Sequence, residues 1–360
     1  MFKPPINEVE PVIRRPYISE VTLPEAKAAF GYAQFRMLIV DKRWDEAISA
    51  LKRALAFDPQ SEKLQLTLAK AYLHNQQIDE GAETLERLLR HSVELSAGWE
   101  LLGELRAYQE RYVEAVAAYT QVLLRDPANE NIRLRLIAVY DQQKDVQKAV
   151  AEANILLGLN PESLPGRLTL ARLQRRNLQS DEAIKTYRDL LVRRPGQLQT
   201  ILELGQLLEK EQQVGDAIDL YRDSINDNPE LLVIYKQLAR ILILQERYAE
   251  ALSLLRQAQQ QRPDDMQILT RIGLLQLSRE DYEGGEETFR SALELFPDEP
   301  RNLYSLGMAL IGQQRNEEAL EAFSRIQQNS DVYAEAVLQR GYLFRLEGDI
   351  EKGIEVLQQA

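Results

Sequence analysis

Small and large apolar residues recur along the chain with a period of 34 residues. A small residue occupies one phase of this period ten times, and in all but one case a larger apolar residue follows it four positions later. Residues i and i+4 share one face of an α-helix, so each pair predicts a buried helical face. The exception is Ala153. The ten small residues are Ala47, Gly81, Ala115, Ala149, Ala183, Ala217, Ala251, Gly285, Ala319 and Gly353.

A second helix is predicted upstream of each of these helices. Segments such as 99–105, 201–207 and 303–310 carry apolar residues in one common helical phase. Proline lacks an amide hydrogen and clashes with the preceding helical turn, so a recurring proline marks where each unit ends. Seven prolines keep the 34-residue spacing, with Val93 at the one missing position: Pro59, Pro127, Pro161, Pro195, Pro229, Pro263 and Pro297.

The combined pattern resembles the tetratricopeptide repeat, whose signature is W-x2-L-G-x2-Y, then A-x3-F, then P, over 34 residues. The resemblance implies an all-α, right-handed superhelical solenoid of ten helix-turn-helix repeats over residues 28–360, the last one truncated. Residues 1–27 are expected to be an extended or disordered N-terminal segment. Repeats are predicted to start at residues 28, 62, 96, 130, 164, 198, 232, 266, 300 and 334. The glycines expected to let the two helices of a unit approach closely are Gly103, Gly205, Gly273, Gly307 and Gly341.

Composition narrows the possible functions. The formal net charge of -12 argues against broad nucleic-acid binding, because neutralising phosphates requires excess Lys and Arg. No apolar run approaches the roughly 18 residues typical of a membrane span, so direct membrane insertion is not predicted. The chain has no cysteine, and His74 and His91 lack any catalytic or metal-binding motif around them, so both are predicted to be surface residues. We therefore predict a non-enzymatic protein without a cofactor or metal.

The expected binding surface is the concave groove, which first helices line in tetratricopeptide arrays. Apolar residues at groove-lining phases cluster in repeats seven to ten, and about half of them are expected to be partly buried between adjacent helices. Such a surface suits an amphipathic helix or an extended apolar peptide. The candidates are Val233, Ile243, Leu244, Leu274, Leu277, Tyr304, Met308, Ile311, Tyr342 and Leu346.

A basic patch is predicted at the same phases of repeat five, where Arg172, Arg175 and Arg176 lie. That repeat holds eight basic and three acidic residues, whereas repeats six and eight are strongly acidic. Two interpretations stay open. The arginines could pair with carboxylates of an acidic partner segment, or they could form salt bridges to neighbouring repeats.

The stretches 271–326 and 329–357 are similar to long bacterial cell-envelope tetratricopeptide proteins. The resemblance implies an adaptor that is periplasmic or associated with the outer membrane, with a processing protease or an export component as its partner. The alternative is a substrate-selecting part of a larger enzyme or of an exopolysaccharide export machine. The truncated last repeat also leaves self-association through uncapped solenoid ends as a further expectation.

Overall fold

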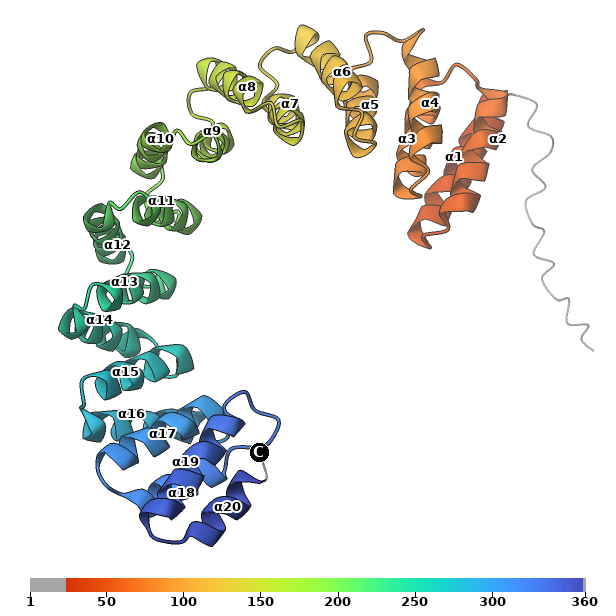
Figure 1. Ribbon diagram of the computed structural model, residues 1–360. Coiled ribbons are helices and arrows are strands. Elements are labelled where there is room, and N and C mark those ends of the chain that lie inside the picture. The colour runs from red at the N-terminus through yellow and green to blue at the C-terminus, as the bar shows by residue number, and fades with distance from the viewer. Residues whose placement is uncertain (1–23, 359–360) are drawn as a thin grey trace, which may run out of the picture. The chain divides into compact units, whose positions relative to one another are not determined.

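The computed structural model describes residues 24–358, and this part of the chain forms helices and no strands (Figure 1). The helices alternate as the first and second members of successive pairs. The first helices are α1 (Pro24–Val40), α3 (Glu62–His74), α5 (Ser96–Tyr108), α7 (Glu130–Gln142), α9 (Leu164–Arg176), α11 (Leu198–Lys210), α13 (Leu232–Leu244), α15 (Met266–Ser278), α17 (Pro300–Gly312) and α19 (Tyr333–Leu346). The second helices are α2 (Trp44–Phe57), α4 (Ile78–Leu89), α6 (Tyr112–Arg125), α8 (Val146–Leu159), α10 (Ser180–Arg193), α12 (Val214–Asp227), α14 (Tyr248–Gln261), α16 (Tyr282–Leu295), α18 (Asn316–Ser324) and α20 (Ile350–Leu357).

The helix starts follow the predicted register. Every first helix from α3 to α17 begins at the predicted first residue of its repeat, and α19 begins one residue early, at Tyr333. Helix α1 begins at Pro24, four residues before the predicted boundary at residue 28. Proline suits the first position of a helix, where its missing amide hydrogen has no partner to lose. The rest of the predicted N-terminal segment, residues 1–23, lies outside the described residues.

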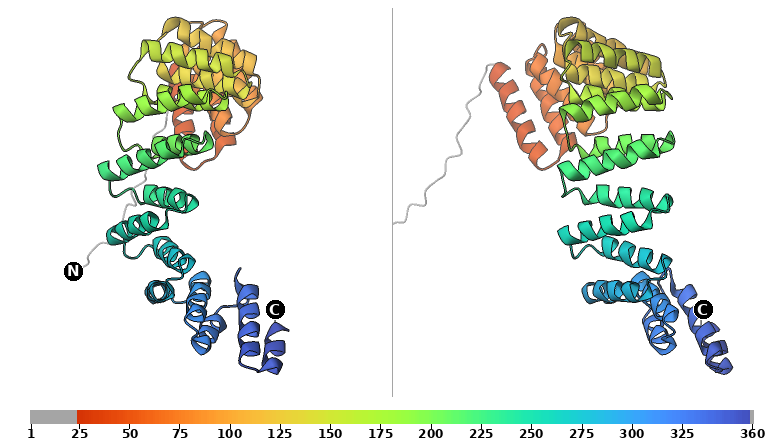
Figure 2. Two further views of the ribbon diagram at one scale, coloured as in Figure 1. Left: turned by 60° about the vertical axis from the view of Figure 1, so that its left-hand side comes forward. Right: turned by 90° about the vertical axis from the view of Figure 1, so that its left-hand side faces the viewer.

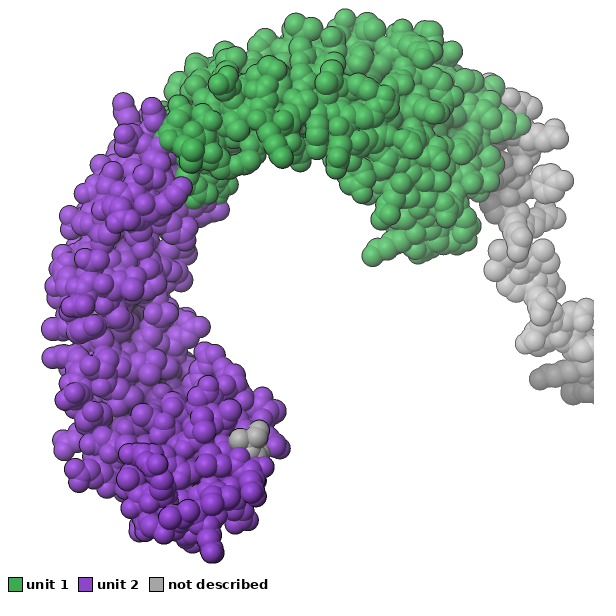
Figure 3. All heavy atoms as spheres, in the orientation of Figure 1, with its two compact units in different colours: residues 1–179 green, residues 180–360 purple. Residues whose placement is uncertain are grey.

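The chain divides into two compact units, residues 1–179 and 180–360 (Figure 3). The first unit contains α1–α9 and the second contains α10–α20, among the described residues. In the second unit, successive helices stack in layers (Figure 2). The first helices α11, α13 and α15 lie along one face of this unit, and the second helices α12 and α14 lie along the other (Figure 1). No helix between residues 24 and 358 combines the length and the apolar character needed to cross a membrane.

Glycine brings the two helices of several repeats into close contact, as the pattern predicted. A β-carbon added at Gly273 would lie 2.5 Å from Cζ of Phe289 on the following helix, and one at Gly103 would lie 2.5 Å from Cε1 of Tyr119. Gly205 packs in the same way on Tyr221, and burial raises the pKa of Tyr221 to about 12. These glycines are therefore required by the aromatic ring that each one faces.

Repeat four achieves the same packing with the sizes reversed. Ala153 stands where the other second helices carry a large residue, and Ile137 stands where the first helices of repeats two, three and five to ten carry Gly or Ala. Both side chains are fully buried in one apolar cluster. The small side chain of Ala153 is thus compensated by the larger side chain of Ile137 on the facing helix.

Each first helix ends in the same backbone turn. The turn residue has a positive φ in all ten repeats, from Lys42 (φ 57°) to Gly348 (φ 83°). The next amide then donates to a carbonyl five residues back, as in the 2.9 Å bond from Gln77 N to Tyr72 O. This is the Schellman closure, and it reverses the chain into the second helix.

Candidate functional site

All ten predicted groove residues lie on first helices of the second unit. They come from α13, α15, α17 and α19, which belong to four successive repeats. The repeat register therefore places all ten residues on first helices, as predicted. How far each side chain is available to a partner depends on its exposure.

Five of these side chains are exposed and five are half-buried. The half-buried residues pack partly against neighbouring helices; for example, the ring of Tyr304 lies 5.6 Å from the ring of Phe323. They are Ile243, Leu277, Tyr304, Met308 and Ile311. The exposed residues are Val233 (42% exposed), Leu244 (67%), Leu274 (48%), Tyr342 (45%) and Leu346 (56%).

Helix α19 exposes one further apolar residue that the sequence analysis did not select. Leu338 is 59% exposed and lies four residues before Tyr342, which in turn lies four residues before Leu346. This spacing places all three side chains on one helical face. Leu338 has the same repeat phase as Tyr304, so the register already contained the information needed to find it.

Two cations on the same helices are held by neighbouring repeats. Lys236 Nζ lies 2.9 Å from Asp265 Oδ2 and donates to Gln267 Oε1 at 2.9 Å. Arg240 donates to both carboxylate oxygens of Glu209, at 2.7 and 2.5 Å. These two charges are thus paired with residues of the neighbouring repeats.

The carboxylate that pairs with Lys236 also caps a helix. Burial raises the pKa of Asp265, but hydrogen bonds from Lys236 and from the backbone amide of Ile268 outweigh it, so the pKa lies below its usual value. The ionised form of Asp265 is therefore the one that joins α13 to α15.

The predicted basic patch lies on α9, at the end of the first unit. Arg176 forms an ion pair with Asp141 of the preceding repeat, as the salt-bridge interpretation expected for this residue. Arg175 is half-buried, and its side chain forms no ion pair or hydrogen bond with residues 24–358. Arg172 is half-buried and interacts with another group. Binding of an acidic partner at this patch stays a prediction.

The two histidines occupy different settings. His74 stacks on Trp44, with ring centroids 4.9 Å apart, so it contributes to packing between the first two repeats. His91 is exposed and lines a cleft of about 370 Å³ with Arg87 and Arg90. Within the described residues, no three Asp, Glu or His side chains are placed to hold a metal ion.

Comparisons with known proteins support the helical-repeat architecture. Two family models, both described as tetratricopeptide repeat, match residues 38–105 and 107–158, and residues 168–230, 236–300 and 304–360. No curated protein matches the sequence significantly. Among solved structures, a tetratricopeptide repeat protein from Parabacteroides merdae ATCC 43184 shares 14% identity over 79% of this chain and 99% of its own, with a TM-score of 0.43. A MamA protein from Desulfovibrio magneticus RS-1 shares 15% identity over 48% of this chain and 97% of its own, also with a TM-score of 0.43.

Proposed function

Since the chain belongs to the tetratricopeptide repeat family, we propose that it is a non-catalytic scaffold whose first-helix groove in repeats seven to ten binds an apolar peptide or amphipathic helix of a partner protein. The groove is defined by the ten predicted residues on α13, α15, α17 and α19. Tetratricopeptide arrays are interaction scaffolds, and the specific surface is our inference from side-chain exposure.

The exposed apolar side chains carry this proposal. Val233, Leu244, Leu274, Tyr342 and Leu346 are all more than two-fifths exposed on first helices, although each could be polar without loss of core packing. Fully burying an exposed side chain of this size contributes about 1.5–3 kcal/mol, so the exposed parts of several of them together help to offset the cost of association. Lys236 and Arg240 are each paired with a carboxylate of a neighbouring repeat. This pairing favours a partner segment with apolar side chains over one with charged side chains.

The test begins with a peptide selected from a random phage-displayed library on the full chain. Its affinity is measured by fluorescence anisotropy for the natural chain and for the double variant Leu274→Ser/Tyr342→Ser. We expect selected peptides to be rich in Leu, Phe and Ile, and the double variant to bind at least about tenfold more weakly, because two apolar contacts are lost.

A matched control distinguishes binding in the groove from nonspecific binding to exposed apolar side chains. Val192 (80% exposed) and Leu295 (49%) are apolar residues of the same unit that lie on second helices, and Val192→Ser/Leu295→Ser should keep the natural affinity. Equal weakening in both double variants, or weakening in the control alone, would remove the groove as the binding site.

Three further expectations stay predictions from the sequence. They are the envelope location, the protease or export partner, and the alternative role as a substrate-selecting part of a larger machine. Self-association through the solenoid ends also stays a prediction; Ile350, Ile354 and Leu357 on α20 are exposed and would take part in it.

A further inference from the structure

An arginine recurs every 34 residues on four consecutive second helices of the second unit, α10, α12, α14 and α16. Each of three arginines reaches a carboxylate on the third residue of the next second helix. The pairs are Arg188–Asp216 at 2.6 Å, Arg222–Glu250 at 2.6 Å and Arg290–Glu318 at 3.2 Å. These pairs form a ladder that links one repeat to the next.

The ladder is interrupted at Arg256. The third residue of the next second helix is Gly284, so the carboxylate is missing. The Arg256 side chain is exposed and makes no ion pair or hydrogen bond with residues 24–358. A side chain has little room at this position: a β-carbon added at Gly284 would collide with Gln276 Nε2 and would lie 2.5 Å from Oδ2 of Asp281, the residue that caps the helix.

Arg256 lines a cleft of about 280 Å³ on α14. Ser253, Gln257 and Gln260 of the same helix contribute to the lining, and Arg279 approaches from the turn before α16. The Arg279 side chain also lacks an ion pair within the described part of the chain. Repeat eight is acidic as a whole, but none of its carboxylates lines this cleft.

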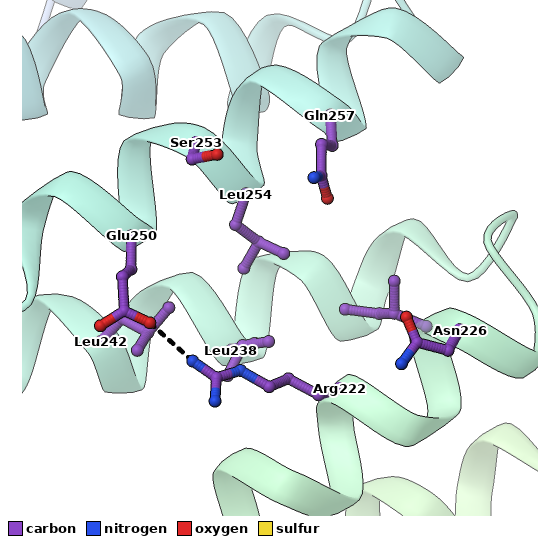
Figure 4. A pocket seen from close by; sticks show the side chains of 9 residues that line it. Arg222, Asn226, Leu238, Leu242, Glu250, Ser253, Leu254 and Gln257 are labelled. Carbon is purple, nitrogen blue, oxygen red and sulfur yellow. Dashed lines mark hydrogen bonds and ion pairs between the residues drawn. The ribbon is translucent and has the colours of Figure 1, made fainter.

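The neighbouring cleft provides an internal comparison. It measures about 290 Å³ and shares Ser253 and Gln257 with the first one. There, Arg222 reaches from α12 toward Glu250 on α14, and the two close an ion pair (Figure 4). One cleft beside α14 therefore holds an arginine that is paired with a carboxylate, and the other holds two arginines that have no acidic partner among residues 24–358.

We propose that the cleft lined by Arg256 and Arg279 binds a side-chain carboxylate of an acidic segment in a partner protein. The incoming carboxylate occupies the place that Asp216, Glu250 and Glu318 hold at the other three positions of the ladder. A guanidinium group matches a carboxylate with two parallel hydrogen bonds, and two guanidinium groups at one cleft favour an anion further. This contact lies on the second helices, so it is separate from the proposed groove and provides a second point of attachment.

The probe is a fluorescein-labelled peptide of alternating glutamate and serine, measured by anisotropy with the full chain. Ionic strength of about 0.1 M limits charge interactions to about 10 Å, which screens the distant negative charges of this acidic protein. We expect Arg256→Gln to weaken binding about two- to fivefold, the range for an exposed ion pair, and Arg256→Gln/Arg279→Gln to weaken it further.

Arg222→Gln is the matched control, since Arg222 occupies the same ladder position but is already paired. It should leave the affinity unchanged. Equal effects of Arg222→Gln and Arg256→Gln would show general attraction to basic residues and overturn the proposal. Equal binding of a glutamine-for-glutamate peptide, or binding of a phosphoserine peptide alone, would exclude a carboxylate site. A circular dichroism melt of each variant separates loss of binding from loss of folding.

Discussion

The turn between the two helices of each repeat depends on single residues in an unusual backbone conformation. Nine of the ten turn residues are not glycine, although φ lies between 57° and 63°. They are lysine, glutamine, glutamate or leucine, residue types that have no preference for this conformation, which costs about 1–2 kcal/mol per residue. The sequence gives no sign of the turn's backbone conformation, because only Gly348 shows the expected residue type. The Schellman hydrogen bonds offset the local cost.

Leu178 provides the clearest test of this strain, because its side chain is 80% exposed and its φ is 59°. We expect Leu178→Gly to raise the free energy of unfolding by about 0.5–1 kcal/mol, since relief of the backbone outweighs the entropy that glycine adds to the unfolded chain. Gly348→Leu, the reverse change at the same phase, should lower it by a similar amount. Urea unfolding followed by circular dichroism measures both. A destabilised Leu178→Gly would mean that the leucine side chain has a role of its own.

Helix pairs fit together through complementary sizes at two facing positions. Gly273 faces Phe289, Gly103 faces Tyr119, and in repeat four Ile137 stands opposite Ala153. Helix starts were predictable because glycine, alanine and proline each mark a fixed phase of the repeat. Position 331, where the 34-residue spacing would place a proline, is Asp331, and the preceding helix α18 ends early, at Ser324.

Repeat four allows the size rule to be tested by a double-mutant cycle. Ala153→Leu should cost about 1–3 kcal/mol through overpacking, and Ile137→Ala should cost about 2–5 kcal/mol through a cavity. The double variant restores the size pattern of the other repeats, so it should be more stable than the sum of the two changes implies, by at least about 1 kcal/mol. Strictly additive free energies of unfolding would show that the two positions do not compensate each other.

In both units, ion pairs connect several neighbouring repeats. Arg176–Asp141 in the first unit and Lys236–Asp265 in the second are examples. The charge sum of a repeat could not reveal such pairs, so the sequence left open whether Arg176 is paired with a neighbouring repeat. The repeat register predicted that the candidate groove residues lie on first helices, but not how exposed each side chain is, because exposure depends on how closely adjacent first helices pack.

These pairs predict the response of the molecule to acid. Burial raises the pKa values of Asp265 and Glu286, but hydrogen bonds from Lys236 to the first and from Arg290, Gln313 and Arg315 to the second outweigh it, so both pKa values lie below normal. A carboxylate with a lowered folded-state pKa stabilises the fold above its unfolded-state pKa of about 4, and this stabilisation is lost as pH falls through the folded-state pKa. We therefore expect the free energy of unfolding to fall steadily below about pH 5.

Asp265→Asn isolates one contribution, since asparagine can still cap α15 but cannot pair with Lys236 as an anion. The variant should be less stable than the natural chain at pH 7 and should lose less stability on acidification. Urea titrations at pH 7, 5 and 3.5 compare the two slopes. Identical slopes would show that this ion pair does not contribute to acid sensitivity.

The unbroken 34-residue register also bears on how such a chain can change in length. Each turn residue, facing glycine and ladder arginine recurs at a constant interval, so a deletion or duplication of one whole interval rejoins equivalent positions. An insertion or deletion of one residue inside a helix rotates every following residue of that helix by about 100° and moves its buried face outward. We therefore expect the fold to tolerate the gain or loss of a whole 34-residue repeat better than a shorter change inside a helix.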